Sequence, residues 1–242
     1  RSSELARVLC DRDKLRAQER SRMKARVLRQ LLYRQGDAWV GGRRKHLFVL
    51  PMRHGGAAAE PRDVTPGDRD AVPASAVFGR GDEFAFSPDG RELVYTAAPL
   101  PLRTQAWSTN YDLVAVNLVS GERRTLTSNA AADTTPRFSP DGHWLAYRAQ
   151  SRAGFAADRW QLVVLDRRTG ERHGVTGDLD PSVNGFAWAA DSAHLFFHGP
   201  ERGREPVWRI ARDGGAGEQI TTGGTATDLN PTPDGRALVF LR

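Results

Sequence analysis

The sequence of 242 residues contains a single cysteine, Cys10, and this scarcity narrows the classes of protein to which it can belong. One thiol cannot build an internal disulfide framework or supply the thiolate cluster of a structural zinc site. Long apolar runs are also missing. None approaches the roughly 18–20 residues that span a bilayer, which predicts a soluble chain without a membrane partner. The chain shows no signal peptide but begins with Arg1 instead of Met, so the sequence leaves its compartment open.

An excess of basic charge is missing from most of the chain, although the formal net charge is +6. Residues 1–34 carry eleven Lys or Arg against four Asp or Glu, whereas the rest of the chain carries 24 against 25. A nucleic-acid-binding surface needs a basic stripe along the folded part, with aromatic side chains that stack on bases. The balanced charge of the body therefore argues against a nucleic-acid partner.

The segment 1–25 lacks Pro and Gly and is rich in Ala, Leu, Arg and Glu. It predicts a charged helix from about Ser3 to Ala25, with a serine available as the N-cap and Glu4 near the positive end of the helix dipole. Apolar positions are sparse, so we expect a solvated helix that lies over another surface. A basic arm for acidic partners is the alternative. Cys10 has no histidine partner nearby, and we interpret it as a spectator thiol.

The rest of the chain is a series of short strand-like runs separated by Gly, Pro, Asp and Asn. The runs recur in one order: an aromatic strand, an "SPDG"-type corner, an apolar strand, a variable loop, and a third strand. A Gly-bearing hairpin then leads to a short fourth strand that ends in Thr. The corner aspartates, spaced 52, 50 and 43 residues apart, are Asp89, Asp141, Asp191 and Asp234. The closing threonines are Thr65, Thr127, Thr176 and Thr221.

Four antiparallel strands in every 40–50 residues are typical of β-propeller blades. A sandwich or a single barrel does not require one motif at a constant phase. We therefore predict an all-β fold, a propeller that follows the helical segment. The predicted blades are 26–66, 78–128, 134–178 and 183–222, with a partial blade over 227–242. The partial blade indicates a piece of a longer protein, or else a four-bladed ring that the last two strands close.

Catalytic, metal and cofactor motifs are not found in the sequence. None of the twelve serines has Gly both two residues before and two residues after it, so the nucleophile elbow of α/β-hydrolases is missing. His194 and His198 have the i,i+4 spacing of zincins, but the glutamate base is missing and the segment resembles a strand. No P-loop, dinucleotide-binding or EF-hand pattern occurs. We expect no catalytic residue, metal ligand or cofactor in this chain.

The four corner aspartates have a mechanical explanation. Pro sets φ at the second turn position, Ser and Asp hydrogen-bond the backbone ahead, and Gly accepts the positive φ at the exit. The aspartate box of sialidase propellers separates its Asp and Gly by one residue, whereas they are adjacent here. Four copies at one phase also argue against catalysis. We predict that Asp89, Asp141, Asp191 and Asp234 are structural turn residues.

Two irregular loops, 98–112 and 149–160, lie between the second and third strands of consecutive blades. Both carry aromatic and Arg side chains, which suits contact with a peptide or with a neighbouring domain. Packing within the loops themselves is the equal alternative. The candidate contact residues are Trp107, Asn110, Arg152, Phe155 and Arg159.

The blade segments also carry a resemblance to a known family. They include "FAFSPDGRELVYTA", "QAWSTNYDLVAVNL", "PRFSPDGHWLAYRAQ", "DRWQLVVLDRRTGE" and "FAWAADSAHLFFHGPERGREPVWRI". These segments resemble the propeller of acylaminoacyl-peptidase-like and dipeptidyl-peptidase-like members of the prolyl oligopeptidase family. The resemblance covers nearly the whole chain, and its loops are more specific than "SPDG", which TolB-type propellers share.

The resemblance implies a serine peptidase with an N-terminal propeller and a C-terminal α/β-hydrolase domain that carries the Ser, Asp and His of a catalytic triad. The propeller of such an enzyme screens and positions peptide substrates. This sequence departs from the family pattern because the hydrolase domain and the first blades are not in it. We therefore expect a noncatalytic fragment whose partners are the hydrolase domain and peptides. The alternative is a stand-alone TolB-type or WD-type propeller that binds proteins.

Overall fold

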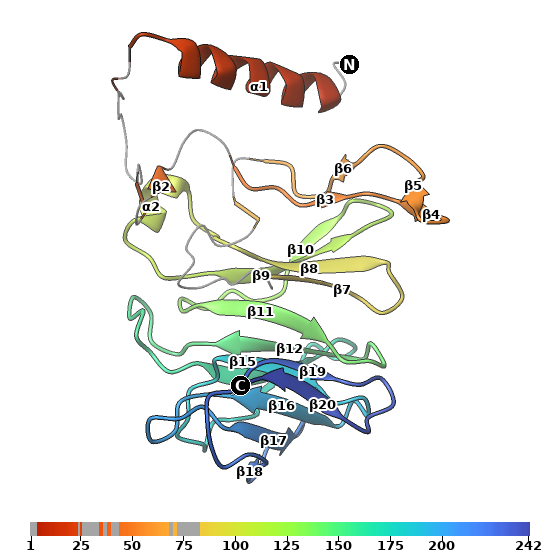
Figure 1. Cartoon of the computed structure of the whole chain (residues 1–242), viewed down its shortest axis with the longest axis vertical. Helices are drawn as coiled ribbons and strands as arrows, with labels where there is room; N and C mark the ends of the chain where they lie inside the picture. The colour runs from red at the N-terminus through yellow and green to blue at the C-terminus, as the bar shows by residue number, and fades with distance from the viewer. Residues whose placement is uncertain are drawn as a thin grey trace.

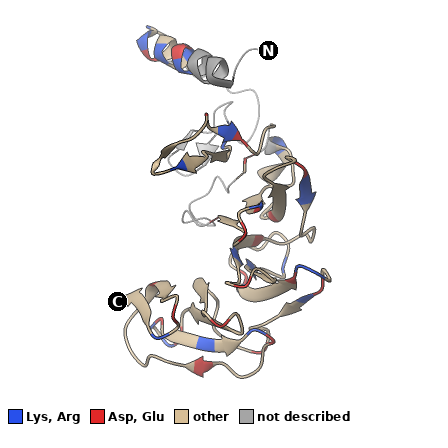
Figure 2. Ribbon diagram, turned by 90° about the vertical axis from the view of Figure 1, so that its right-hand side faces the viewer, with Lys and Arg blue, Asp and Glu red and all other residues tan. Residues whose placement is uncertain are grey.

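The structure is a computed structural model, and it describes residues 4–23, 25, 34–35, 38–39, 44–67, 70–71 and 83–242. The described chain consists mainly of short antiparallel strands in small sheets that are stacked one after another (Figure 1). Seen from the side, the successive sheets follow an open arc (Figure 2). Stacked four-stranded sheets of this kind are propeller blades, and the predicted all-β propeller fold is confirmed.

Three blades have four strands each. The second blade consists of β7 (Phe84–Phe86), β8 (Glu92–Ala97), β9 (Asp112–Asn117) and β10 (Arg123–Thr125). The third blade consists of β11 (Asp133–Phe138), β12 (Trp144–Ala149), β13 (Gln161–Asp166) and β14 (Arg172–Gly174). The fourth blade consists of β15 (Gly185–Trp188), β16 (His194–His198), β17 (Val207–Ala211) and β18 (Glu218–Gln219). Each is a meander in which every strand pairs with the next along the chain.

The first and fifth blades are less complete within the described residues. In the first blade β3 (Phe48–Val49) pairs with β6 (Arg62–Asp63), and the hairpin of β4 (Met52–Arg53) and β5 (Gly56–Ala57) lies between them in the chain. A separate pair joins β1 (Arg34–Gln35) and β2 (Ala38–Trp39). The strand predicted at the start of 26–66 falls largely outside the described residues. The fifth blade contains β19 (Thr227–Pro231) and β20 (Leu238–Leu241).

The hydrophobic core lies between blades. Along β8 successive side chains point to opposite faces of the sheet. Leu93 and Tyr95 pack toward the first blade, whereas Val94 packs with Leu145 and Tyr147 of the third blade. All of these side chains are buried, and each such burial contributes about 1.5–3 kcal/mol. This two-sided burial explains why "ELVYTA" is a nearly continuous apolar run instead of a strict alternation.

The largest core cluster joins the third and fourth blades. Leu162 and Ile210 are buried in it, and the rings of Phe197 and Trp208 stack with their centroids 6.1 Å apart. Trp188 adds a polar contact between the two blades, because its Nε1 donates to the carbonyl of Arg137 at 3.0 Å. A single blade could not bury these aromatic surfaces, so the blades stabilise one another in sequence.

The closing threonines hold the third strand of each blade. Thr127 Oγ1 accepts the backbone N–H of Leu113 at 2.9 Å, and Thr176 Oγ1 accepts that of Leu162 at 2.9 Å. The same bond joins Thr65 to Leu47 and Thr221 to Val207, at 2.8 and 2.9 Å. The recurrent "LT" of the sequence therefore marks a hydrogen bond that fixes the fourth strand inside its own blade.

Arginines make a second recurrent contact, this time between blades. Arg123 at the start of β10 donates from Nη1 to the carbonyl of Pro66 in the first blade at 3.0 Å. Arg172, at the same position in the third blade, donates to the carbonyl of Leu126 in the second blade. The fourth strands of the second and third blades are thus tied back to the end of the preceding blade.

The two helices of the described residues lie outside the blades. Helix α1 (Glu4–Arg20) stands apart from the sheets (Figure 1), so the other surface expected beneath it is not one of the described blades. It ends five residues before the predicted Ala25, where the Ser21 hydroxyl accepts the N–H of Met23 at 3.1 Å and replaces a helical bond. Helix α2 (Leu102–Gln105) is a single turn inside the first irregular loop. No helix among the described residues is long and apolar enough to cross a membrane.

The antiparallel meander gives each blade two distinct ends. We call the end that carries the "SPDG" turns the corner end. The opposite end, where β8 and β12 finish and β9, β11 and β13 begin, we call the loop end. Both irregular loops leave from the loop end. Their side chains and the first residues of β9, β11 and β13 therefore lie at the same end of the molecule.

Candidate functional site

At the corner end, Asp89 holds the turn between β7 and β8. Its Oδ1 accepts the hydroxyl of Ser87 at 2.6 Å and the N–H of Arg91 at 3.1 Å. Ser87 Oγ in turn accepts the N–H of Glu92 at 2.9 Å. The hydrogen bond from Ser87, followed by that from Arg91, lowers the pKa of Asp89. The carboxylate is thus engaged with its own turn, as expected of a structural residue.

Two other corners repeat this geometry. Asp141 accepts the Ser139 hydroxyl at 2.5 Å, and Asp234 accepts the Thr232 hydroxyl at 2.6 Å. The glycine after each aspartate has a positive φ, including 73° at Gly142, which an L side chain rarely adopts. Three of the four predicted turn residues therefore occupy one local structure.

The corner at Asp191 is built differently. Ala189 stands where the others have Ser or Thr, and Asp191 Oδ1 accepts the N–H groups of Ala193 and His194 at 2.8 and 3.0 Å. Ser192 replaces the glycine with a φ of 56°. Its hydroxyl accepts the N–H of Asp141 at 3.1 Å, which links the corners of the third and fourth blades. The departure from "SPDG" therefore coincides with a contact between blades.

At the loop end, the two irregular loops touch. The N–H of Gly154 donates to Thr109 Oγ1 at 3.2 Å, although the residues belong to different blades. Trp107, which follows α2, is 78% exposed. Asn110 is turned inward instead, and its Nδ2 donates to the carbonyl of Asn129 at 2.9 Å. Of these two candidate residues, Trp107 is free to meet a partner and Asn110 holds the loop.

The second loop divides in the same way. The guanidinium of Arg152 lies over the ring of Phe155, 4.2 Å from its centroid, and the ring is partly exposed. Arg159 points back into the third blade, where it donates to the carbonyls of Gly177 and Leu179. The structure therefore presents Trp107, Arg152 and Phe155 at the surface of the loop end and uses Asn110 and Arg159 in the packing of the loops.

A chain of hydrogen-bonded polar side chains, which we call the polar chain and which the sequence analysis missed, begins at the buried Glu83 at the loop end. The Glu83 carboxylate accepts the hydroxyl of Thr96 at 2.6 Å and, from the third blade, the N–H of Thr135 at 3.1 Å. Burial raises the pKa of Glu83, and these bonds partly offset that rise. Thr135 has a φ of 58°, within an irregularity of the β11–β12 pairing. The carboxylate thus bonds a strained backbone position of the next blade.

The polar chain continues from Thr135 into the fourth blade. Arg148 donates from Nη2 to Thr135 Oγ1 at 3.0 Å and from Nη1 to the carbonyl of Asn184 at 2.9 Å. Asn184 Nδ2 donates to Glu205 at 3.0 Å, and Glu205 lies 3.2 Å from Nδ1 of His198. Burial lowers the pKa of His198. Three consecutive blades are therefore joined by side chains at the loop end.

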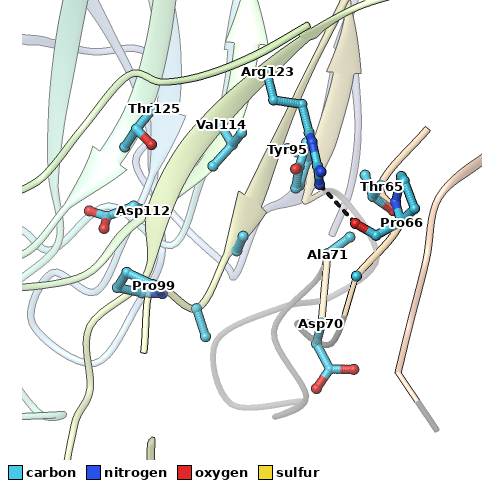
Figure 3. Close-up of a pocket in the computed structure, with 13 residues that line it drawn as sticks. Thr65, Pro66, Asp70, Ala71, Tyr95, Pro99, Asp112, Val114, Arg123 and Thr125 are labelled. Atoms are coloured by element: carbon cyan, nitrogen blue, oxygen red, sulfur yellow. Dashed lines mark hydrogen bonds between the residues drawn. The ribbon is translucent and has the colours of Figure 1, made fainter. Parts of the chain in front are cut away.

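A cavity of about 380 Å³ opens between the first and second blades at the loop end. Asp70 and Asp112 line it together with Tyr95, and Arg123 borders it while donating to Pro66 (Figure 3). Small apolar side chains complete the wall. Asp112 stands where the next two blades carry Gln161 and Pro206. The sequence signal that could have identified Asp112 was a carboxylate at a position of the repeat where the next two blades carry an uncharged residue.

The two histidines with zincin-like spacing do not form a metal site. His194 Nδ1 lies 2.7 Å from Asp191 Oδ2, and His198 is paired with Glu205 at the other end of β16. Among the residues that the structure describes, no group of three His, Cys, Asp or Glu side chains could hold a metal ion.

Comparison with known proteins places this geometry in a family. The chain is 31% identical over 199 residues to dipeptidyl-peptidase 5 of Porphyromonas gingivalis. This alignment covers 82% of the chain and 29% of that protein. The chain thus spans less than a third of that relative's length. No protein-family model matches the chain.

Solved structures agree on the fold. A TolB-like protein from Agrobacterium tumefaciens aligns with a TM-score of 0.61 at 18% identity, over 80% of this chain and 62% of that one. A puromycin-hydrolysing peptidase of Mycobacterium tuberculosis aligns with a TM-score of 0.53 at 18% identity, over 82% and 35% of the two chains. From its stacked blades and its dipeptidyl-peptidase homologues, the chain belongs to the β-propeller part of the prolyl oligopeptidase family.

Proposed function

We propose that the loop end of this propeller segment screens and positions peptide substrates for an α/β-hydrolase domain. Its homologues are dipeptidyl peptidases, and the sequence itself contains no nucleophile elbow. The observation that carries the proposal is the contact between Thr109 and Gly154, which brings together two loops with exposed aromatic side chains.

The exposed side chains suit this task. Trp107 and Phe155 offer apolar surface for a peptide side chain or for a facing domain, and Arg152 adds a positive charge above the Phe155 ring. The polar chain from Glu83 to His198 joins three consecutive blades at the same end of the molecule. A rigid base of this kind keeps a contact surface at a fixed distance from a neighbouring active site.

The test uses the intact peptidase that contains this propeller. Trp107→Ala and Phe155→Ala should change the ratio of kcat/KM between a dipeptidyl substrate and a longer peptide by about fivefold or more, because a lost apolar contact is worth about 1–3 kcal/mol. Val119→Ala is the matched control, since Val119 is 83% exposed but lies at the corner end. Unchanged ratios in both loop variants would contradict substrate screening.

The noncatalytic part of the proposal has its own test. The purified 242-residue chain should release no p-nitroaniline from dipeptidyl or acyl-peptide anilides. Turnover that copurifies with the 242-residue chain, and does not come from a contaminating hydrolase, would show that the propeller itself carries a catalytic site.

A stand-alone propeller that binds a protein partner is the second candidate function. The structural likeness to TolB-type propellers favours it. The two candidates differ in what the gene encodes after Arg242. A reading frame that continues into a Gly-x-Ser-x-Gly elbow supports the peptidase, and a stop codon at that position supports the stand-alone binding module.

A further inference from the structure

Two buried carboxyl groups meet one hydroxyl at the junction of the second and third blades. Asp112 begins β9 and is 5% exposed, and Asp133 begins β11 and is fully buried. Thr127 Oγ1 donates to Asp112 Oδ1 at 3.4 Å, and its nearness lowers the pKa of Asp133 as well. The backbone joins the blades at the same place, because the N–H of Asp133 donates to the carbonyl of Tyr111 at 2.8 Å.

Donors at this junction are too few for two carboxylates. The Thr127 hydroxyl has one proton to give, and its oxygen already accepts the N–H of Leu113. Asn129 Nδ2 donates to Asp133 Oδ2, but Asp133 Oδ1 has no hydrogen-bond partner among the described residues. A buried carboxylate oxygen without a donor is costly, and two neighbouring carboxylates repel each other. One retained proton removes both penalties.

The blade architecture does not require these acids. At the junction of the third and fourth blades the same positions carry Gln161 and Val183, with Thr176 as the closing threonine. The backbone bond is preserved there, from the N–H of Val183 to the carbonyl of Trp160 at 2.9 Å. The two junctions therefore share the same backbone hydrogen bond. The junction of the second and third blades has two titratable groups at these positions, and the junction of the third and fourth blades has none.

We propose that Asp112 and Asp133 retain one proton between them and that this proton holds the second and third blades together. When the proton leaves, the two carboxylates repel each other and the bond between Asp133 and Tyr111 opens more often. Asp112 lines the cavity between the first and second blades, so the proton can pass to water there (Figure 3). The junction between the second and third blades is thus a proton-dependent joint.

Other titratable groups around the pair set the range of the effect. Arg172 of β14 is the cation near Asp133, and it lowers the pKa of that carboxyl only in part. Burial, and after it the charge of Asp133, raises the pKa of the Tyr147 phenol in β12, so the phenol stays neutral. Burial also raises the pKa of Tyr111, and the charges of Asp70 and Glu83 add to that rise. Two further carboxylates bond across this junction: Glu83 accepts the N–H of Thr135 at 3.1 Å, and Glu92 accepts from Arg167 Nη2 at 2.9 Å.

The sign of the pH dependence follows from burial. Burial raises the pKa of Asp112 to about 6 and that of Asp133 to about 7, and the charge of Asp112 adds to the second rise. In the unfolded chain both groups return to about 3.9. Between about pH 4 and 7 the folded state binds more protons than the unfolded state, so this junction loses stability as the pH rises through that window.

Amide hydrogen exchange of the whole 242-residue chain tests the proposal without any substitution. The protection factor of the Asp133 amide, divided by that of Val183, should fall about tenfold or more between pH 5 and pH 8.5, since one pKa unit is a tenfold change. The Val183 amide serves as an internal control with the same backbone bond. A ratio that stays constant over this range would overturn the proposal.

Variants then assign the effect to the pair. Asp133→Asn should remove most of the pH dependence of the ratio, because it removes the group with the more strongly raised pKa. Asp112→Asn, which abolishes the repulsion but leaves Asp133 buried, should weaken the dependence, and it keeps the test available even if the first variant does not fold. Glu83→Gln should leave the dependence in place, as should Asp180→Asn at an exposed site. A dependence that disappears in Glu83→Gln but stays undiminished in both Asp112→Asn and Asp133→Asn would assign the proton to Glu83 and reject the proposed pair.

Discussion

Gly199 packs so closely against Ser182 that a β-carbon at residue 199 would stand 1.7 Å from the Ser182 carbonyl oxygen. Gly199 directly follows β16, and Ser182 lies just before β15. The obstructing atom belongs to the backbone, so it cannot move aside as a flexible side chain can. The loop end of the fourth blade therefore depends on the missing side chain.

Gly199→Ala should lower the free energy of unfolding by about 2–3 kcal/mol, as overpacking of a rigid interior does. Urea denaturation followed by tryptophan fluorescence measures the change. Gly174→Ala is the control, because the nearest atom to its β-carbon would be Gln161 Oε1 at 4.0 Å. Equal midpoints for the two variants would mean that the backbone around Ser182 relaxes freely.

Thr176→Val should cost about 1–3 kcal/mol, because the substitution keeps the shape of the side chain but leaves the buried N–H of Leu162 without an acceptor. Thr222→Val at an exposed position is the matched control and should change the urea midpoint little. Amide hydrogen exchange should show a loss of protection confined to β13 and β14, which would locate the destabilisation at this hydrogen bond. No loss in Thr176→Val would remove the closing threonines from the account of blade stability.

Arg148→Met should lower the free energy of unfolding by about 2–4 kcal/mol, since it removes charge-assisted bonds to Thr135 and Asn184 at the loop end. The variant should also raise the pKa of Glu83 further, because the guanidinium charge lowers that pKa in the wild type. Carboxyl NMR titration checks this second effect, which a purely steric defect would not produce. Arg202→Met, with a side chain that is 93% exposed, is the control.

Asp89→Ala should lower the urea midpoint at neutral pH through loss of the turn bonds from Ser87 and Arg91. The pKa of Asp89 is lowered in the folded state, so its contribution is present above the ordinary pKa and lost as the pH falls through the folded value. The gap between wild type and variant should therefore close in acid. Asp178→Ala is an exposed control. In the intact peptidase, loss of activity in Asp89→Ala with unchanged stability would contradict a turn role.

The blades could be predicted because their signals repeat. "SPDG" and the closing "LT" recur at one phase, and each corresponds to a local hydrogen-bond pattern that a few adjacent residues determine. Local turns and strand alternation are what a sequence encodes most directly. The same reasoning made the end of α1 too long, because a side-chain bond at Ser21 competes with the last helical turn.

The polar chain and the acid pair could not be predicted in this way. Glu83, Arg148 and Glu205 come from three blades and from different phases of the repeat, so no spacing in the sequence joins them. In the loops between second and third strands, the sequence also did not show which side chains are exposed. Composition alone did not separate the exposed Trp107 from Arg159, whose guanidinium turns back to its own blade. Such contacts depend on how consecutive blades are stacked.

The bonds of the closing threonines and of the arginines have a consequence for the order of unfolding. A threonine bond completes each blade internally, whereas Arg123 and Arg172 attach a blade only to the one before it. Rupture of one junction therefore leaves both neighbouring sheets with their own hydrogen bonds. Under a stretching force the arc should lengthen in separate steps of about one blade each. At alkaline pH the junction between the second and third blades has lost its shared proton, so this junction should open first.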